Sequence, residues 1–162
     1  MIFEGEYSCV CNELCLKRPV YPNGESIIVF DLDGVLIKQV ERYENGRRVS
    51  DGYRMHGQAR EVVKRAVYDF RKVVLWSAIS DCFNRLEGFP FSETHLRIRG
   101  VYSSDDGGIK NLRMLSANMR KVAALEDFDG ESGAFEPADR VVRVREGDSL
   151  MDRYFEARDL VI

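Results

Sequence analysis

The segment that most constrains the fold is residues 27–36, which read IIVFDLDGVL. Four apolar residues in a row suit a strand that is covered on both faces of a parallel sheet. Asp31 and Asp33 follow at the carboxyl end of this strand, where open α/β sheets bind their ligands. Alternation along an extended chain predicts that Asp31 and Asp33 point the same way, while Leu32 turns back into the core.

Two carboxylates on one face repel each other unless a cation or a proton lies between them. Asp31 and Asp33 therefore indicate a divalent metal site, an acid/base pair, or both. Gly34 allows a sharp turn directly after them. The simpler alternative is an Asp-Gly turn after a buried strand, which needs only one of the two aspartates.

Length and composition are those of one globular domain, with 162 residues, of which 44% are hydrophobic and 31% charged. No apolar run approaches the length of a membrane span. The first residues, MIFEGEYSC, lack the basic start of a signal peptide. We expect a cytoplasmic protein with an amino-terminal arm over residues 1–24 and one domain over residues 25–162.

Charge is spread unevenly around a net value of −3. Residues 42–72 hold nine Lys or Arg against four acids, whereas residues 126–162 hold eleven acids and five Arg. The basic stretch follows the two aspartates directly and could attract an anionic substrate through its field. It could equally be the solvated side of a hairpin and of a helix.

Three of the four cysteines, Cys9, Cys11 and Cys15, are clustered as C-x-C-x3-C. This spacing matches no standard zinc motif, and a zinc site would need a fourth ligand from Cys82 or a histidine. Reduced cysteines in a packed arm are the simpler interpretation.

Apolar patterns predict strands that alternate with helices. The predicted strands are residues 27–30, 73–76, 96–102 (a less central strand or an excursion), 122–125 and 140–144. The predicted helices are residues 57–72, residues 111–120 and a final one that Asp148 or Ser149 caps and that runs through Phe155. Asn45-Gly46 predicts a tight turn within a small β-hairpin insertion over residues 38–56. The alternation favours a mostly parallel, doubly wound α/β sheet without a large cap domain.

Polar side chains follow three of these strands or turns, and parallel strand ends converge on one edge of a sheet. Ser77 offers a hydroxyl, Lys110 a fixed positive charge, and Glu126 and Asp127 carboxylates for a hard cation such as Mg²⁺. Each has a plainer explanation as a turn residue, a solvated lysine or a charged loop. Their joint order at predicted boundaries favours one site.

This order resembles that of the haloacid dehalogenase superfamily, whose phosphatases begin with Asp-x-Asp-x-[Thr/Val]. The segments LWSAIS and IKNLRMLSANMRKVAALED are similar to those of phosphatases that act on the carboxy-terminal domain of RNA polymerase II, and of their NLI-interacting-factor-like relatives. The resemblance covers roughly residues 27–155. Here Gly34-Val35 replaces the Glu-Thr usual in that group, and Glu126 replaces an aspartate.

The resemblance implies a Rossmann-like three-layer sandwich and assigns roles to the polar residues. Asp31 would be the nucleophile and Asp33 the general acid/base. The implied phosphate-binding residues are Ser77, Ala78 and Lys110. The implied Mg²⁺ ligands are Asp31, the backbone carbonyl of Asp33, Glu126 and Asp127.

The expected function is that of a magnesium-dependent phosphomonoesterase that forms an aspartyl-phosphate. Without a cap, the site should be open and suit a bulky substrate, such as a phosphoprotein or a nucleic-acid end. The alternatives are a non-catalytic binding module on the same fold, a small-metabolite phosphatase roofed by a dimer partner, and phosphoryl transfer to an acceptor other than water. The oligomeric state is left open.

Overall fold

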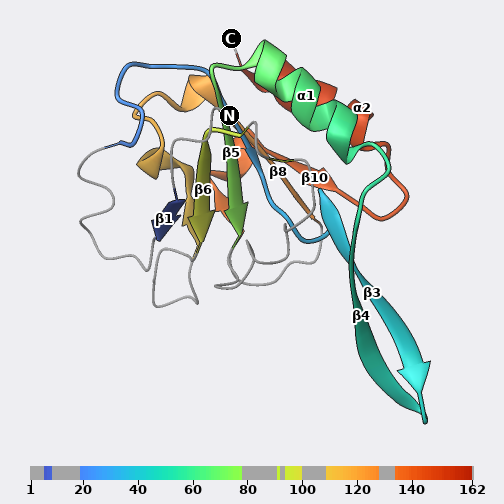
Figure 1. The fold of residues 1–162 in the computed structure, drawn as a ribbon. Coiled ribbons are helices and arrows are strands. Elements are labelled where there is room, and N and C mark those ends of the chain that lie inside the picture. The colour runs from blue at the N-terminus through green and yellow to red at the C-terminus, as the bar shows by residue number, and fades with distance from the viewer. Residues whose placement is uncertain are drawn as a thin grey trace.

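A computed structural model describes residues 6–8, 19–77, 91, 94–99, 109–127 and 134–161. Its centre is a parallel six-stranded sheet with the order β1-β6-β5-β2-β8-β10 (Figure 1). The strands are β1 (Glu6–Ser8), β2 (Ile27–Phe30), β5 (Lys72–Ser77), β6 (Leu96–Arg99), β8 (Val122–Asp127) and β10 (Val141–Val144). The predicted mixed α/β fold with a parallel sheet is therefore confirmed.

Strand β2 lies in the middle of the sheet and is buried on both faces, as its apolar run predicts. Ile28 and Phe30 belong to one core cluster, whereas Ile27 and Val29 belong to the cluster on the other face. Leu32 continues the alternation and is fully buried with Ile28 and Phe30. The first residue after β2, Asp31, therefore emerges on the face of Ile27 and Val29.

Two helices, α1 (Ala59–Asp69) and α2 (Leu150–Leu160), lie side by side on one face of the sheet (Figure 1). Both contribute buried side chains to the cluster that contains Phe30. Ser149 caps α2 as predicted, since its side chain accepts a hydrogen bond from the Asp152 N–H. The helix extends beyond Phe155 to Leu160, because Tyr154 and Ala157 continue its buried stripe.

On the opposite face of the sheet, the helix predicted over residues 111–120 is wrong. Two short 3₁₀ turns, η3 (Leu112–Met114) and η4 (Met119–Lys121), take its place. Asn111 and Asn118 each accept a hydrogen bond from the backbone N–H two residues later, so each starts a new turn. Of the three residues expected on the inner face of that helix, Leu112 and Leu115 are nevertheless fully buried, and Met119 is partly buried.

The remaining short elements lie beside these turns. Strand β7 (Lys110–Asn111) pairs in parallel with β9 (Phe135–Glu136), and the 3₁₀ turn η5 (Ala138–Arg140) leads into β10. Lys110 also donates its backbone N–H to the Ala134 carbonyl at 2.9 Å. This small second sheet brings Lys110 and Phe135 together.

The predicted hairpin is confirmed. Strands β3 (Ile37–Glu44) and β4 (Arg47–Met55) form an antiparallel ribbon that projects away from the body of the molecule (Figure 1). Both turn residues have positive φ values, 52° at Asn45 and 75° at Gly46. These angles are what an Asn-Gly hairpin turn requires.

Strand β6 and the amino-terminal arm both contribute to the central sheet. Strand β6 belongs to the parallel sheet, between β5 and β1, so the excursion is excluded for Leu96–Arg99. The arm contributes β1 to the sheet's edge. Among the described residues, no helix has the length and apolar character needed to cross a bilayer.

Candidate active site

The carboxyl ends of the three central strands bring three of the predicted residues to one edge of the sheet. Asp31 follows β2 directly, Ser77 is the last residue of β5, and Glu126 lies near the end of β8. The Asp31 backbone N–H donates to the Leu125 carbonyl at 2.9 Å, which holds Asp31 level with Glu126. Ser77 is 2% exposed and extends slightly further along the same edge.

A buried charge pair at this edge joins Asp31 to Lys110. The Lys110 Nζ atom lies 3.3 Å from Asp31 Oδ1, and the two side chains are 2% and 13% exposed. Nζ also lies 3.9 Å from the centre of the Phe135 ring, a cation–π contact. Asp31 Oδ1 accepts a second hydrogen bond, from the Leu32 N–H at 2.9 Å. The sequence-predicted carboxylate and lysine are thus brought together.

Burial raises the pKa of Asp31 from 3.8 to about 6. Lys110 and the Leu32 N–H oppose that rise, because they stabilise the charged form, whereas the negative charge of Glu126 adds to it. Asp31 is therefore a poorly solvated carboxylate that ionises close to neutral pH. Its oxygen atoms can act as nucleophiles, and a further positive charge nearby would stabilise its ionised form.

Both carboxylate oxygens of Glu126 already have protein partners. Oε2 accepts the Phe135 backbone N–H at 2.9 Å, and Oε1 lies 3.1 Å from Arg143 Nη2. Arg143 is paired with Glu126 in the register of β8 and β10, so both side chains lie on the face of Asp31. The positive charges of Lys110 and Arg143 thus border the two carboxylates.

The chain turns tightly after Asp31, as Gly34 predicts. The Leu32 carbonyl accepts hydrogen bonds from the N–H groups of residues 35–37, and the Gly34 N–H donates to the Ile37 carbonyl at 2.9 Å. Gly34 has a φ of 81°. A Cβ atom on it would lie only 2.5 Å from the Asp127 Cβ atom. Asp127 therefore packs against the turn that carries the half-buried Asp33.

The predicted magnesium shell is not gathered in the described part of the chain. No three His, Cys, Asp or Glu side chains converge there as a metal-binding group. Glu126 is held by Arg143 and the Phe135 N–H, and Lys110 occupies the space beside Asp31. Asp31 and Glu126 are the carboxylates at this edge that would hold a magnesium ion, and Lys110 and Arg143 are the cations beside them.

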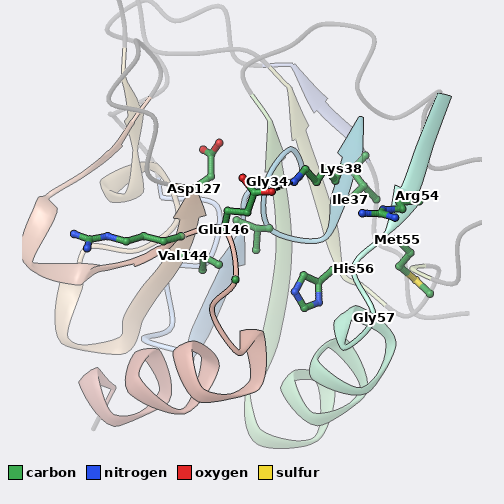
Figure 2. Close-up of a pocket in the computed structure, with 13 residues that line it drawn as sticks. Gly34, Ile37, Lys38, Arg54, Met55, His56, Gly57, Asp127, Val144 and Glu146 are labelled. Atoms are coloured by element: carbon green, nitrogen blue, oxygen red, sulfur yellow. Dashed lines mark hydrogen bonds and ion pairs between the residues drawn. The ribbon is translucent and has the colours of Figure 1, made fainter. Parts of the chain in front are cut away.

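A cleft of about 960 Å³ opens beside the turn (Figure 2). It extends from Asp127 to the base of the ribbon, where Lys38 and Arg54 lie, and the loop after β10 lines its near wall. His56 also lines it, and the His56 Nδ1 atom accepts the Gln58 N–H at 3.0 Å. Burial lowers the pKa of His56, so its ring is neutral near pH 7.

Some expected residues lie outside the described part of the chain, namely Ala78 and all four cysteines. His95 is described, and its Nδ1 atom accepts the Val73 N–H at 3.1 Å near the start of β5. It therefore lies at the opposite edge of the sheet from His56, which follows β4.

The sequence reasoning missed Arg143, Phe135 and the contact between Gly34 and Asp127. Arg143 left one signal, since it is a charged residue inside the apolar segment VVRV. Nothing in the sequence indicated Phe135, because its contact with Lys110 depends on the pairing of β7 with β9. No protein-family model and no curated protein sequence matches this chain.

Proposed function

We propose that the protein is a phosphomonoesterase in which Asp31 attacks the phosphorus of the substrate. The observation that carries this proposal is the contact between Asp31 and the buried Lys110 at the carboxyl edge of the central strand. A desolvated carboxylate held against one fixed cation can approach a phosphate group, whose own charge the lysine would neutralise. The resemblance to the haloacid dehalogenase superfamily, and its Rossmann-like three-layer fold, belongs to the same proposal.

The reaction has two steps in this scheme. An Asp31 oxygen forms a bond to phosphorus while the bond to the leaving oxygen breaks, and Asp33 gives that oxygen a proton. Asp33 then takes a proton from a water molecule that attacks the aspartyl-phosphate, which releases inorganic phosphate and restores Asp31. Lys110 and the Ser77 hydroxyl stabilise the charge on the transferring group.

Magnesium, which the resemblance implies, would supply further positive charge at the phosphate. The charges of Lys110 and Arg143 already lie beside Asp31 and Glu126, so the need for the ion is an experimental question. Phosphate release from p-nitrophenyl phosphate, measured with magnesium and with EDTA, answers it. Activity lost in EDTA and restored by magnesium supports a metal enzyme, whereas full activity in EDTA assigns the electrostatic role to the side chains.

The decisive experiment is to trap the intermediate. Acid quenching during turnover of a ³²P-labelled substrate should leave label on the protein that hydroxylamine removes, as expected for an acyl phosphate. Peptide mapping should place the label on Asp31. A protein that neither releases phosphate nor takes up label with any aryl phosphate would be a binding module and not an enzyme.

The proposed substrate is bulky, either a phosphoprotein or a nucleic-acid end, and the proposed location is cytoplasmic. The open cleft of about 960 Å³ and the absence of a cap among the described residues support the size of the substrate.

A further inference from the structure

The cleft beside the turn carries more basic than acidic side chains. Of the charged residues that line it, three are basic and two are acidic: Lys38, Arg54, Arg145, Asp127 and Glu146. The side chain of His56 is neutral near pH 7 and adds no charge. The basic residues come from the base of the ribbon and from the loop after β10.

Two of the cations are held directly opposite each other. Lys38 and Arg54 are cross-strand partners in the register of β3 and β4, so their side chains leave the same face of the ribbon. Like charges in that position destabilise a hairpin. The pair therefore does not stabilise the hairpin, but it provides two adjacent hydrogen-bond donors for an anion.

One of these two donors, Lys38, already forms an ion pair with a carboxylate of the protein, that of Glu146. The Glu146 Oε1 atom lies 2.5 Å from Lys38 Nζ, and the two side chains are 85% and 50% exposed. An ion pair this exposed is weak, because water screens it and two flexible side chains must be ordered to form it. A phosphate group can therefore displace Glu146 and bind Lys38 and Arg54 together.

Two further arginines lie on this face of the ribbon, further from the cleft, and Glu44 lies between them. Arg42 is four residues beyond Lys38 on β3 and pairs with Glu44 at 3.1 Å, and Arg47 is the cross-strand partner of Glu44 near the tip. An anion that reaches Arg42 would compete with Glu44, as it competes with Glu146 for Lys38. Four strand residues span about 13 Å. An anion bound in the cleft must be extended to reach Arg42 as well. This distance favours a chain of phosphates over a compact bisphosphate.

The cleft also lies close to the proposed chemistry. Gly34 and Val35 line it, and both belong to the turn that follows Leu32 and includes Asp33. A group bound at Lys38 and Arg54 would thus belong to the leaving side of a substrate whose terminal phosphate reaches Asp31.

We propose that Lys38 and Arg54 bind an internal phosphate of a single nucleic-acid strand whose terminal phosphate is the group removed. This inference rests on the proposed function, because it names the substrate class for that site. Glu146 acts as the competing anion that the strand displaces.

The test measures binding alone, in the inactive Asp31→Asn background. The probe is a short fluorescent single strand that ends in a phosphate, and the readout is fluorescence anisotropy. Adding Lys38→Gln and Arg54→Gln should weaken binding about tenfold and reduce the steepness of log K against log salt by about 1.4, because each cation that contacts a single strand contributes about 0.7. Adding Glu146→Gln instead should strengthen binding about threefold, since one competing ion pair is lost.

Matched controls are Lys64→Gln and Arg71→Gln, which remove exposed charges on α1 and at the opposite edge of the sheet. Neither should alter binding beyond the change in net charge, and thermal melts should show every variant folded. Equal losses in control and cleft variants would overturn the proposal. So would a bisphosphorylated mononucleotide or an acidic phosphopeptide that binds as tightly as the strand.

Failure of the two proposals can be told apart. If wild-type protein releases no phosphate from any ester but the strand still binds through Lys38 and Arg54, the catalytic proposal fails and the cleft assignment stands. If the protein hydrolyses aryl phosphate but the strand binds equally well without Lys38 and Arg54, the catalytic proposal stands and the cleft assignment fails.

Discussion

Gly34 and Asp127 approach so closely that one added methyl group would overlap the aspartate. A Cβ atom on Gly34 would lie 2.5 Å from the Asp127 Cβ atom and 2.7 Å from Oδ2. The contact joins the turn after β2 to the end of β8. It therefore fixes the position of Asp33 relative to the strand that carries Glu126.

We expect Gly34→Ala to destabilise the fold by about 2 kcal/mol or more, because it adds this overlap to the cost of a positive φ. Gly46→Ala is the matched control, since its φ of 75° is similar but a Cβ atom there meets nothing within 4 Å. It should cost about 1 kcal/mol. Urea denaturation measures both, and equal losses would show that the contact with Asp127 is not tight.

The pKa of Asp31 should move in opposite directions in two variants. Lys110→Met removes the main group that lowers it, so the pKa should rise above 6. Glu126→Gln removes a neighbouring negative charge, so the pKa should fall. Carboxyl ¹³C titration by NMR, without divalent metal, follows both. A pKa near 4 in the wild-type protein would show that the carboxyl is well solvated.

Asp31→Asn should reduce phosphate release at least about 10³-fold, because an amide oxygen cannot form the intermediate. Asp33→Asn should slow both half-reactions. Asp152→Asn, an exposed change in the first turn of α2, is the control and should retain full activity. Wild-type turnover in Asp31→Asn would eliminate the proposed mechanism.

Asp69 joins the two helices, and its ionisation should stabilise the protein. Burial alone would raise its pKa, but hydrogen bonds from Tyr154, Arg65 and Arg158 outweigh that effect and lower it below 3.8. The Tyr154 hydroxyl donates to Oδ2 at 2.7 Å. A lowered pKa means that this stabilisation is complete above pH 3.8 and is lost as the pH falls through the folded-state value.

Tyr154→Phe should therefore cost about 1.5–3 kcal/mol at pH 7, because it removes a hydrogen bond to a charged group. The loss should shrink below pH 3.8, as Asp69 becomes protonated in both proteins. Glu156→Gln, which breaks an exposed pair with Arg153, should cost less than about 1 kcal/mol. Thermal denaturation across pH 2.5–7 measures both variants. A loss that stays constant across this range would contradict the role of Asp69.

The sequence predicted the central strands well because their constraint is local. A run such as Ile27–Phe30 has to be buried on both faces, and Asn45-Gly46 favours only a few turn geometries. The segment after Lys110 was mispredicted because Asn111 and Asn118 compete for backbone N–H groups. A hydrophobic stripe cannot reveal that competition.

The sequence predicted several residues of the candidate site but not which of them contact one another. Strand ends alone indicated that Asp31 and Glu126 would be neighbours. The partner of Glu126 depends on the register of β8 with β10, which places Arg143 beside it. The position of Lys110 depends on the pairing of β7 with β9. Such long-range pairings leave no periodic signal in a single sequence.

The ribbon has an evolutionary consequence. Its outer residues, 41–48, are all exposed, and most of the contacts of β3 and β4 are with each other. Substitutions there cost little stability, since they leave no cavity and expose no buried polar group. Descendants of this protein could therefore acquire new ligand preferences by changing the ribbon, while the edge that holds Asp31 and Lys110 stays intact.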